Sequence, residues 1–322
     1  MSRIPSCIQI SLAVLCVALA CPAQAQPGGK LMRIVVPFAA GGAREVLART
    51  FYSELGAALG ATAIIDNRPG AGGAIGTASV AKAAPDGQTL IFAASSHNVT
   101  ALLGANPPYD PIKDFAGVAN IGMQSYVLMA SAAVPAKTVA ELLKHARANP
   151  GKLNYASAGH GSSSHLAMAY FAALAGLDMV HIPFKSTQDA NNDVLAARSH
   201  AVIVPNVGAI PYAKDGRIRL LGVTSRARSA FLPEVPAIAA SGVPGYEFDS
   251  WFGLLAPART PKAVIERINA EVAKLLGSPV ILGRLASQGV EPRPLSPEAF
   301  ERLIREDHED MAKVVKAVGR IE

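Results

Sequence analysis

A glycine-rich loop follows the first apolar segment of the chain and has the composition of an anion-binding loop. The segment RIVVPF at residues 33–38 is followed by AAGG at residues 39–42 and then by a helical pattern. Small residues leave the first backbone N–H groups of a helix uncovered, and such groups bind anions without a charged side chain. Gly41 and Gly42 therefore predict a site for a small anion, although glycines also serve simply to form a tight turn.

A second glycine-rich segment, GAGGAIG at residues 70–76, matches only part of a dinucleotide-binding fingerprint. Ile75 stands where the third glycine of that fingerprint belongs. The segment does not predict a dinucleotide site.

A serine-rich loop, YASAGHGSSSH at residues 155–165, precedes an apolar helical pattern. Serine hydroxyls accept hydrogen bonds from the first N–H groups of a helix, and a serine-rich helix start is also an oxyanion-binding surface. Helix capping and anion binding thus predict the same residues. A serine hydrolase also needs a histidine base and an orienting acid, and the loop lacks the G-x-S-x-G elbow. The candidate residues are Ser157, Gly159, Gly161 and Ser162.

Two further strand ends carry polar residues that could face a ligand. The segment TLIFAAS ends in Ser95, which is followed by Ser96. The segment HIPFKS places Lys185 and Ser186 where a strand should pass into a helix. Lys185 could point into a crevice or simply cover the surface.

The sequence does not predict a metal site. His160 and His165 lie five residues apart with no acidic residue nearby. The acidic run EDHED at residues 306–310 lacks the ligand spacing of a calcium loop and predicts a solvated helix face.

Strand and helix patterns alternate along the chain, which predicts an α/β architecture. A helix is expected at residues 44–59, and another follows the capping box formed by Thr138 and Glu141. Each expected strand ends in small or polar residues, and in a doubly wound sheet such strand ends line one crevice where ligands bind. A chain of 322 residues, half of them apolar, is long enough for two domains of this kind.

The N-terminus has the features of an export signal at residues 1–25. Arg3 precedes the apolar run IQISLAVLCVALA, and small residues at AQA suit cleavage before Gln26. All three cysteines lie inside this segment, so the mature chain would contain none. Lipid attachment at Cys21 is the less favoured alternative, because Ala18 stands where a leucine is expected.

The positive charge of the chain is modest and scattered. The formal net charge is +6, and removal of Arg3 with the signal leaves +5. No run of lysines and arginines is interleaved with aromatic residues, so nucleic acid binding is not expected. The excess charge would help to attract small carboxylates.

Several segments of the chain fall in the order and spacing of the Bug family. They include the glycine-rich and serine-rich loops and HIPFK described above, together with NRPGAGGAIG, PYDPIKDF, LPEVPAIAASGVPGYE and WFGLLAPARTP. The chain resembles the periplasmic substrate-binding proteins of tripartite tricarboxylate transporters. The resemblance implies a type II periplasmic binding protein fold, in which two doubly wound α/β lobes close on a small carboxylate. It implies a monomeric receptor without catalysis or cofactor that delivers its ligand to a two-component membrane permease. The first lobe would contain residues 26–125 and 248–322, and the second residues 126–247.

The resemblance also implies the residues that hold the ligand carboxylate through backbone groups and ordered water. In the first lobe these are Phe38, Ala40, Gly41 and Gly42, with Ser95 and Ser96 close by. In the second lobe they are Ser157, Gly159, Gly161 and Ser162, and Lys185, Ser186 and Asn206 complete the predicted set.

Departures from the family pattern bear on the identity of the ligand. Glu45, preceded by Arg44, stands where an aspartate is usual, and Ser186 replaces a glycine. Val204 replaces a carboxylate, while Asn206 remains. An apolar residue at this position removes an acceptor for an amino or hydroxyl group. We therefore expect a mono- or dicarboxylate, aromatic acids included, rather than an amino acid.

Two alternatives to a transport receptor remain open. A secreted hydrolase could use Ser157 or Ser162 with His160 or His165, and it would turn over an ester. A sensor that signals to a membrane partner would use the same ligand site and differ only in its docking surface.

Overall fold

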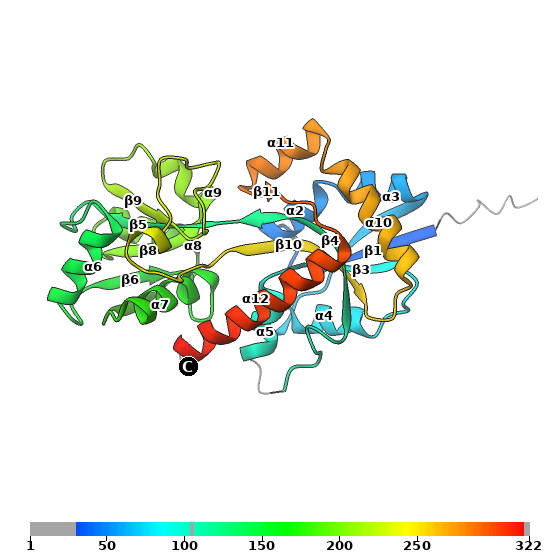
Figure 1. Ribbon diagram of the computed structural model, residues 1–322, viewed down its shortest axis with the longest axis horizontal. Coiled ribbons are helices and arrows are strands. Elements are labelled where there is room, and N and C mark those ends of the chain that lie inside the picture. The colour runs from blue at the N-terminus through cyan, green and yellow to red at the C-terminus, as the bar shows by residue number, and fades with distance from the viewer. Residues whose placement is uncertain (1–29, 104–105, 319–322) are drawn as a thin grey trace, which may run out of the picture.

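The structure, a computed structural model, describes residues 30–103 and 106–318 and contains two β-sheets with helices packed against them (Figure 1). We call each sheet with its helices a lobe. The predicted export signal and Cys21 lie outside the described residues. None of the helices in the described ranges combines the length and apolar composition that a membrane span needs.

The first lobe contains a six-stranded sheet with the strand order β11-β4-β10-β3-β1-β2. β1 pairs in parallel with β2 and β3, whereas β10 is antiparallel to β3 and β4. The strands are β1 (Lys30–Val36), β2 (Ala61–Asn67), β3 (Thr89–Ala94), β4 (Phe115–Gln124), β10 (Ser250–Pro257) and β11 (Glu291–Pro292).

Among the described residues, seven α-helices and one short 3-10 helix accompany this sheet. They are α2 (Ala43–Arg49), α3 (Tyr52–Leu59), η1 (Ala71–Gly73), α4 (Ala74–Ala81), α5 (Ser96–Leu103), α10 (Lys262–Leu275), α11 (Pro279–Ser287) and α12 (Pro297–Val318).

The single helix expected at residues 44–59 is wrong, because the chain forms α2 and α3 with a break between them. The Thr50 hydroxyl donates to the Leu47 carbonyl oxygen (2.7 Å), and Phe51 leaves the helical conformation at φ −142°. The Phe51 side chain is buried in the core of the lobe. The break thus directs a large aromatic ring into the core.

The second lobe contains a five-stranded sheet with the order β7-β6-β8-β5-β9. β6 is parallel to β7 and β8, and β5 is antiparallel to β8 and β9. Its strands are β5 (Tyr126–Ser131), β6 (Asn154–Ser157), β7 (Val180–Pro183), β8 (Ala201–Pro205) and β9 (Ile218–Val223). Its helices are α6 (Val139–Ala148), α7 (Ser163–Ala175), α8 (Thr187–Leu195), α9 (Asn206–Ala209), η2 (Ile210–Tyr212) and η3 (Ala239–Ser241).

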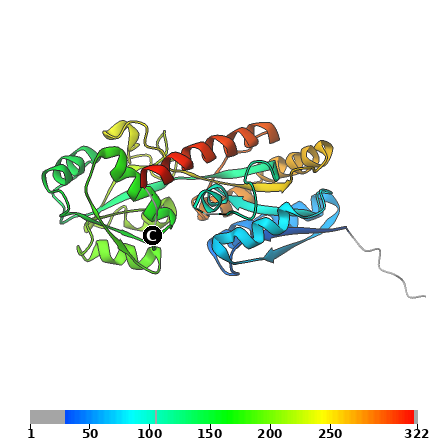
Figure 2. The same cartoon turned by 90° about the horizontal axis from the view of Figure 1, so that it is seen from below.

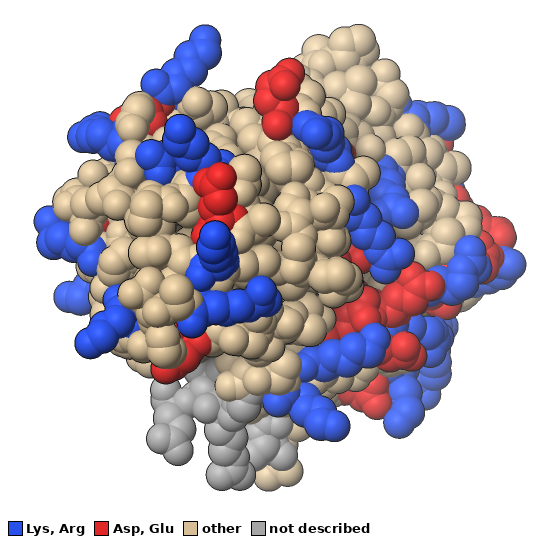
Figure 3. All heavy atoms as spheres, turned by 60° about the vertical axis from the view of Figure 1, so that its left-hand side comes forward, with Lys and Arg blue, Asp and Glu red and all other residues tan. Residues whose placement is uncertain are grey.

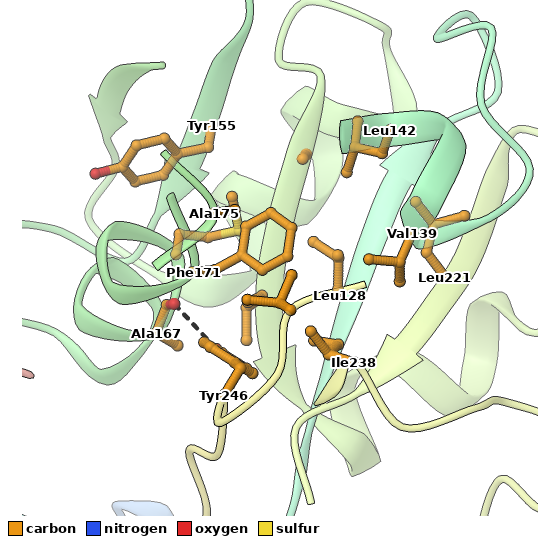
Figure 4. Packing of buried hydrophobic residues seen from close by; sticks show 14 of the residues in the cluster. Leu128, Val139, Leu142, Tyr155, Ala167, Phe171, Ala175, Leu221, Ile238 and Tyr246 are labelled. Atoms are coloured by element: carbon orange, nitrogen blue, oxygen red, sulfur yellow. Dashed lines mark hydrogen bonds between the residues drawn. The ribbon is translucent and has the colours of Figure 1, made fainter. Parts of the chain in front are cut away.

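The chain passes between the sheets twice, between β4 and β5 and between β9 and β10 (Figure 1). On the return path, the Tyr246 hydroxyl donates to the Ala167 carbonyl oxygen of α7 (3.0 Å; Figure 4). Tyr246 is fully buried beside Phe171 in the core of the second lobe. The division of the whole chain at residues 125–126 and 247–248 stays a prediction.

Helix α12 also joins the two lobes (Figures 1 and 2). Phe300 and Ile304 near its start pack in a core cluster of the first lobe. Met311 and Val314, further along, belong to the core cluster of the second. On the face seen in Figure 3, Lys and Arg side chains are interspersed with Asp and Glu.

Gly253 in β10 permits the close packing of α12 on the first sheet. A Cβ atom at this position would overlap the Phe300 ring and would lie 2.7 Å from the Ala119 carbonyl oxygen. We expect Gly253→Ala to lower the free energy of unfolding by about 1–3 kcal/mol because the added methyl group overpacks this contact. Urea unfolding measures the change.

Gly283→Ala in α11 is the matched control, since a Cβ there meets no atom within 4 Å. Alanine in a helix is favoured over glycine, so this variant should be unchanged or more stable by up to about 1 kcal/mol. Equal stabilities for the two variants would contradict the packing argument.

Candidate ligand-binding site

A cavity of about 540 Å³ lies between the two lobes. We call it the interlobe cavity. It is bordered by the start of α2, the end of β3, helix α5, the start of α7 and the two crossing segments. Its lining residues are Phe38, Arg44, Ala71, Gly72, Ser95, Ser96, Val99, Thr100, Leu103, Tyr126, Gly161, Ser162, Ser163, Leu166, Phe248, Asp249, Ser250 and Met311.

Arg44 contributes a positive charge to this cavity. Its guanidinium carbon lies 4.0 Å from the centre of the Phe38 ring, within the range of a cation–π contact. The Nη1 atom is buried and has no hydrogen-bond partner among the described residues. Burial lowers the pKa of Arg44, and the proximity of Tyr126 partly offsets the shift.

Glu45, the neighbour of Arg44, does not pair with it. Its carboxylate accepts the N–H of Gly41 and binds Arg49, with 2.6 Å between Arg49 Nε and Glu45 Oε1. The pKa of Glu45 is lowered, first by the Gly41 N–H and then by Arg49. Glu45 therefore holds the loop in shape, and Arg44 forms no ion pair within the described part of the chain.

The end of β3 and the start of α5 line the cavity on the side of the first lobe. The Ser95 hydroxyl oxygen accepts a hydrogen bond from the backbone N–H of Trp251 (3.1 Å), which joins the end of β3 to β10. Ser96, Val99 and Thr100 of α5 continue the lining.

The second-lobe wall is the start of α7. Ser162 is the N-cap: its hydroxyl oxygen accepts the His165 N–H (3.2 Å) and its hydroxyl donates to the Gly159 carbonyl oxygen (2.7 Å). Ser162 and Ser163 face the cavity from this first turn. The positive end of the helix dipole and the first N–H groups of α7 thus meet the same cavity as Arg44.

Asp249 lies in the segment that leads into β10. The Thr224 hydroxyl donates to its Oδ1 atom (2.9 Å), and burial raises the pKa of Asp249 to about 7. This carboxyl group therefore keeps its proton in weakly acidic solution, where an ordinary aspartate is ionised.

The model of a family described as "Tripartite tricarboxylate transporter family receptor" matches residues 47–320 of this chain. A UPF0065 protein in the tcbD-tcbE intergenic region of Pseudomonas sp. is 37% identical over 282 residues, which are 87% of this chain and 84% of that protein. BugT of Bordetella pertussis is 30% identical over 99% of this chain and 98% of its own. The chain belongs to this family.

Solved structures agree with this assignment. A protein of R. palustris with adipate is 33% identical and superposes with a TM-score of 0.74, covering 90% of this chain and 97% of that one. The periplasmic binding protein BugD gives 30% identity and a TM-score of 0.70, covering 91% and 98%. MatC from Rhodopseudomonas palustris with bound malate is 31% identical and superposes with a TM-score of 0.72. The match covers 88% of this chain and 98% of that one. The predicted family and the predicted fold of two α/β lobes are confirmed.

The structure places only part of the predicted site in the cavity lining. Phe38, Ser95, Ser96, Gly161 and Ser162 line the cavity. The predicted residues outside the lining are Ala40, Gly41, Gly42, Ser157, Gly159, Lys185, Ser186 and Asn206.

Several of the residues outside the lining have other partners. The Gly41 N–H, expected to face a ligand carboxylate, is taken by Glu45. Ser186 caps α8 by accepting the Asp189 N–H (3.1 Å), and Asn206 donates to the Gly289 carbonyl oxygen (3.0 Å). Lys185 is exposed. The part that these residues play toward a ligand stays a prediction.

Ser157 is fully buried, and its Oγ atom lies 2.6 Å from Nε2 of His181. The predicted hydrolase pairing with His160 or His165 is therefore wrong for Ser157. His181 lies on β7, far along the chain, and sequence spacing gave no reason to join it to the serine loop.

Sequence reasoning also missed Tyr126, Phe248, Asp249 and Met311 in the cavity lining. These residues come from the crossing segments and from α12, which meet the site only because the two lobes face each other. Arg44 also lines the cavity and was noted in the sequence only as the residue before Glu45.

The raised pKa of Asp249 gives a pH dependence with a definite sign. The folded state retains a proton between about pH 4 and pH 7 that the unfolded chain releases, so stability falls as the pH rises through this window. Asp249→Asn keeps an acceptor for Thr224 and removes the charge. We expect the variant to gain stability over the wild type on the order of 2–4 kcal/mol between pH 4 and pH 8.

Urea unfolding at pH 4, 6 and 8 measures this difference. Burial also raises the pKa of Asp307 to about 7, but that contribution is common to both proteins and cancels in the comparison. Parallel stability curves for the wild type and the variant would show that Asp249 does not titrate in this range.

Proposed function

We propose that this protein is an extracytoplasmic solute receptor that binds a small mono- or dicarboxylate, aromatic acids included, in the interlobe cavity. It delivers this ligand to the two-component permease of a tripartite tricarboxylate transporter. Export through a signal at residues 1–25, a monomeric state and lobes divided at residues 125–126 and 247–248 belong to the same proposal. Membership of the receptor family supports the transport role.

The observation that carries the ligand class is the unpaired guanidinium nitrogen of Arg44 at the cavity. A buried charge without a partner is costly, and an anion that enters the cavity offsets this cost with charge-assisted hydrogen bonds. Glu45 is close in sequence but is occupied by Gly41 and Arg49, so it does not compete for Arg44. A ligand carboxylate is the partner that the geometry favours.

The other walls of the cavity suit the rest of such a ligand. The start of α7 adds backbone N–H groups for a carboxylate, while Phe38, Leu166 and Phe248 offer apolar surface for a carbon skeleton. The volume of about 540 Å³ falls within the range of small-molecule sites. Binding of adipate and malate by the two relatives solved with these ligands supports the choice of a carboxylate.

A hydrolase is the second candidate, because Ser157 and His181 are in hydrogen-bond contact. Burial lowers the pKa of His181 to about 4, which makes the ring a weak base at neutral pH, and Ser157 has no exposed surface. The receptor proposal predicts no ester turnover. Turnover that is lost in Ser157→Ala would favour the hydrolase instead. A sensor would share the cavity and differ in its membrane partner.

Arg44→Met tests the proposal, because methionine keeps apolar contact with Phe38 and removes the charge. A panel of small carboxylates screened by thermal shift identifies the ligand, and calorimetric titration then gives its dissociation constant. Loss of a charge-assisted hydrogen bond worth about 1.5–3 kcal/mol predicts a 10- to 150-fold weaker affinity. The ligand-free variant should also melt at a higher temperature than the wild type, because a buried unpaired charge is gone.

Lys144→Gln is the matched control, since it removes a positive charge from an exposed residue on α6 that is outside both the cavity lining and the predicted site. Its affinity for the carboxylate should equal that of the wild type. The same affinity in Arg44→Met as in the wild type would remove the main support for the proposed ligand class.

A further inference from the structure

Three histidine rings meet in the second lobe, beside the start of α7. His160 lies in the loop after β6, His165 in the first turn of α7, and His181 on β7. One nitrogen of each ring lies within 4.8 Å of the nitrogens of the other two. The ring centres of His165 and His181 are 4.0 Å apart, and those of His160 and His181 are 4.8 Å apart.

This spacing is close to what one transition-metal ion requires. Zinc–imidazole bonds of about 2.0–2.1 Å at tetrahedral angles place two ligand nitrogens about 3.4 Å apart. The rings of His165 and His181 are stacked in near-parallel planes (10°), so they must turn out of this arrangement before a nitrogen of each can point at one ion. His160 is exposed, so its ring is free to rotate and gives an ion a route from solvent.

Burial disfavours the protonated, cationic form of two of the rings. Burial lowers the pKa of His181 to about 4, with the charges of His165 and His160 acting in the same direction. Burial and then His160 lower the pKa of His165. A lowered pKa favours the neutral imidazole, which is the form that binds a metal ion.

Partners outside the cluster orient these two rings in the metal-free protein. The Ser157 hydroxyl can stay as a second-shell acceptor at a metal site, whereas the bond to His165 comes from a donor and must break. Ser157 Oγ lies 2.6 Å from His181 Nε2, and the Gly161 N–H donates to His165 Nδ1 (3.1 Å). The stacked ring of Tyr155 covers His181, with ring centres 5.0 Å apart.

We propose that His160, His165 and His181 together bind one Zn²⁺ ion, with water or a small anion in the fourth position. Three imidazoles are a ligand set that zinc uses readily, and they leave one position open. The helix dipole at the start of α7 opposes a cation weakly, and an anion in the fourth position offsets this effect.

Zinc binding also changes the cavity wall. Whichever nitrogen of His165 takes the ion, the bond from the Gly161 N–H is lost, because the nitrogen without the ion must carry the ring proton. Gly161 lines the interlobe cavity, so the loss of this bond changes a residue of the ligand site. The metal site is thus joined to the ligand site by one backbone group.

Calorimetric titration of the untagged protein with ZnCl₂ at pH 7.5, without organic ligand, tests the proposal. We expect one ion per chain for the wild type and at least a 10-fold weaker affinity for His160→Asn. His160 is exposed, so this variant should keep the circular dichroism spectrum and the carboxylate affinity of the folded protein. The metal titration is therefore independent of the proposed receptor function.

His145→Asn is the matched control, because His145 is a half-buried histidine on α6 outside the cluster. It should bind zinc as the wild type does. The absence of zinc binding in the wild type, or equal affinities in the wild type and His160→Asn, would overturn the proposal.

Discussion

The buried, unpaired Nη1 atom of the half-buried Arg44 is the constraint on which the proposed function depends. The loop before α2 is built so that this charge remains available: Glu45 binds Gly41 and Arg49, and the Phe38 ring supports the guanidinium group from one side. A protein gains nothing in stability from such a charge alone, because desolvation opposes it. The charge becomes favourable only when an anion occupies the cavity.

The cavity exists because two connecting segments and helix α12 hold the two lobes opposite each other. β4 continues into β5, β10 returns to the first sheet, and α12 packs on both lobes (Figures 1 and 2). Tyr246 fixes the return segment on α7, and Asp249 follows three residues later at the cavity. Closure of the lobes on a ligand would therefore bend a few defined segments and would leave the two cores intact.

Local signals in the sequence predicted much of the fold. The alternation of apolar segments gave the α/β class, and Thr138 caps its helix as expected by accepting the Glu141 N–H (3.1 Å). The break between α2 and α3 was missed because it depends on burial of Phe51, which is a tertiary effect. Ser95, Ser96 and Ser162 were placed at the cavity by strand and helix ends alone. Tyr126 and Asp249 were not, since no local pattern reports how two lobes face each other.

The histidine cluster shows the same limit of sequence reasoning. His160 and His165 are neighbours in the chain, but His181 joins them only through the parallel pairing of β6 with β7, which sets Tyr155 opposite His181. The spacing of residues along the chain does not predict the register in which two strands pair. Chemistry that depends on pairing between distant segments requires the structure.

A crystal structure of the protein with its carboxylate ligand tests the central claim most directly. The account predicts one ligand in the interlobe cavity with a carboxylate oxygen about 2.7–2.9 Å from Nη1 of Arg44. A ligand bound elsewhere, or a carboxylate held only by backbone groups with Arg44 turned away, would contradict it.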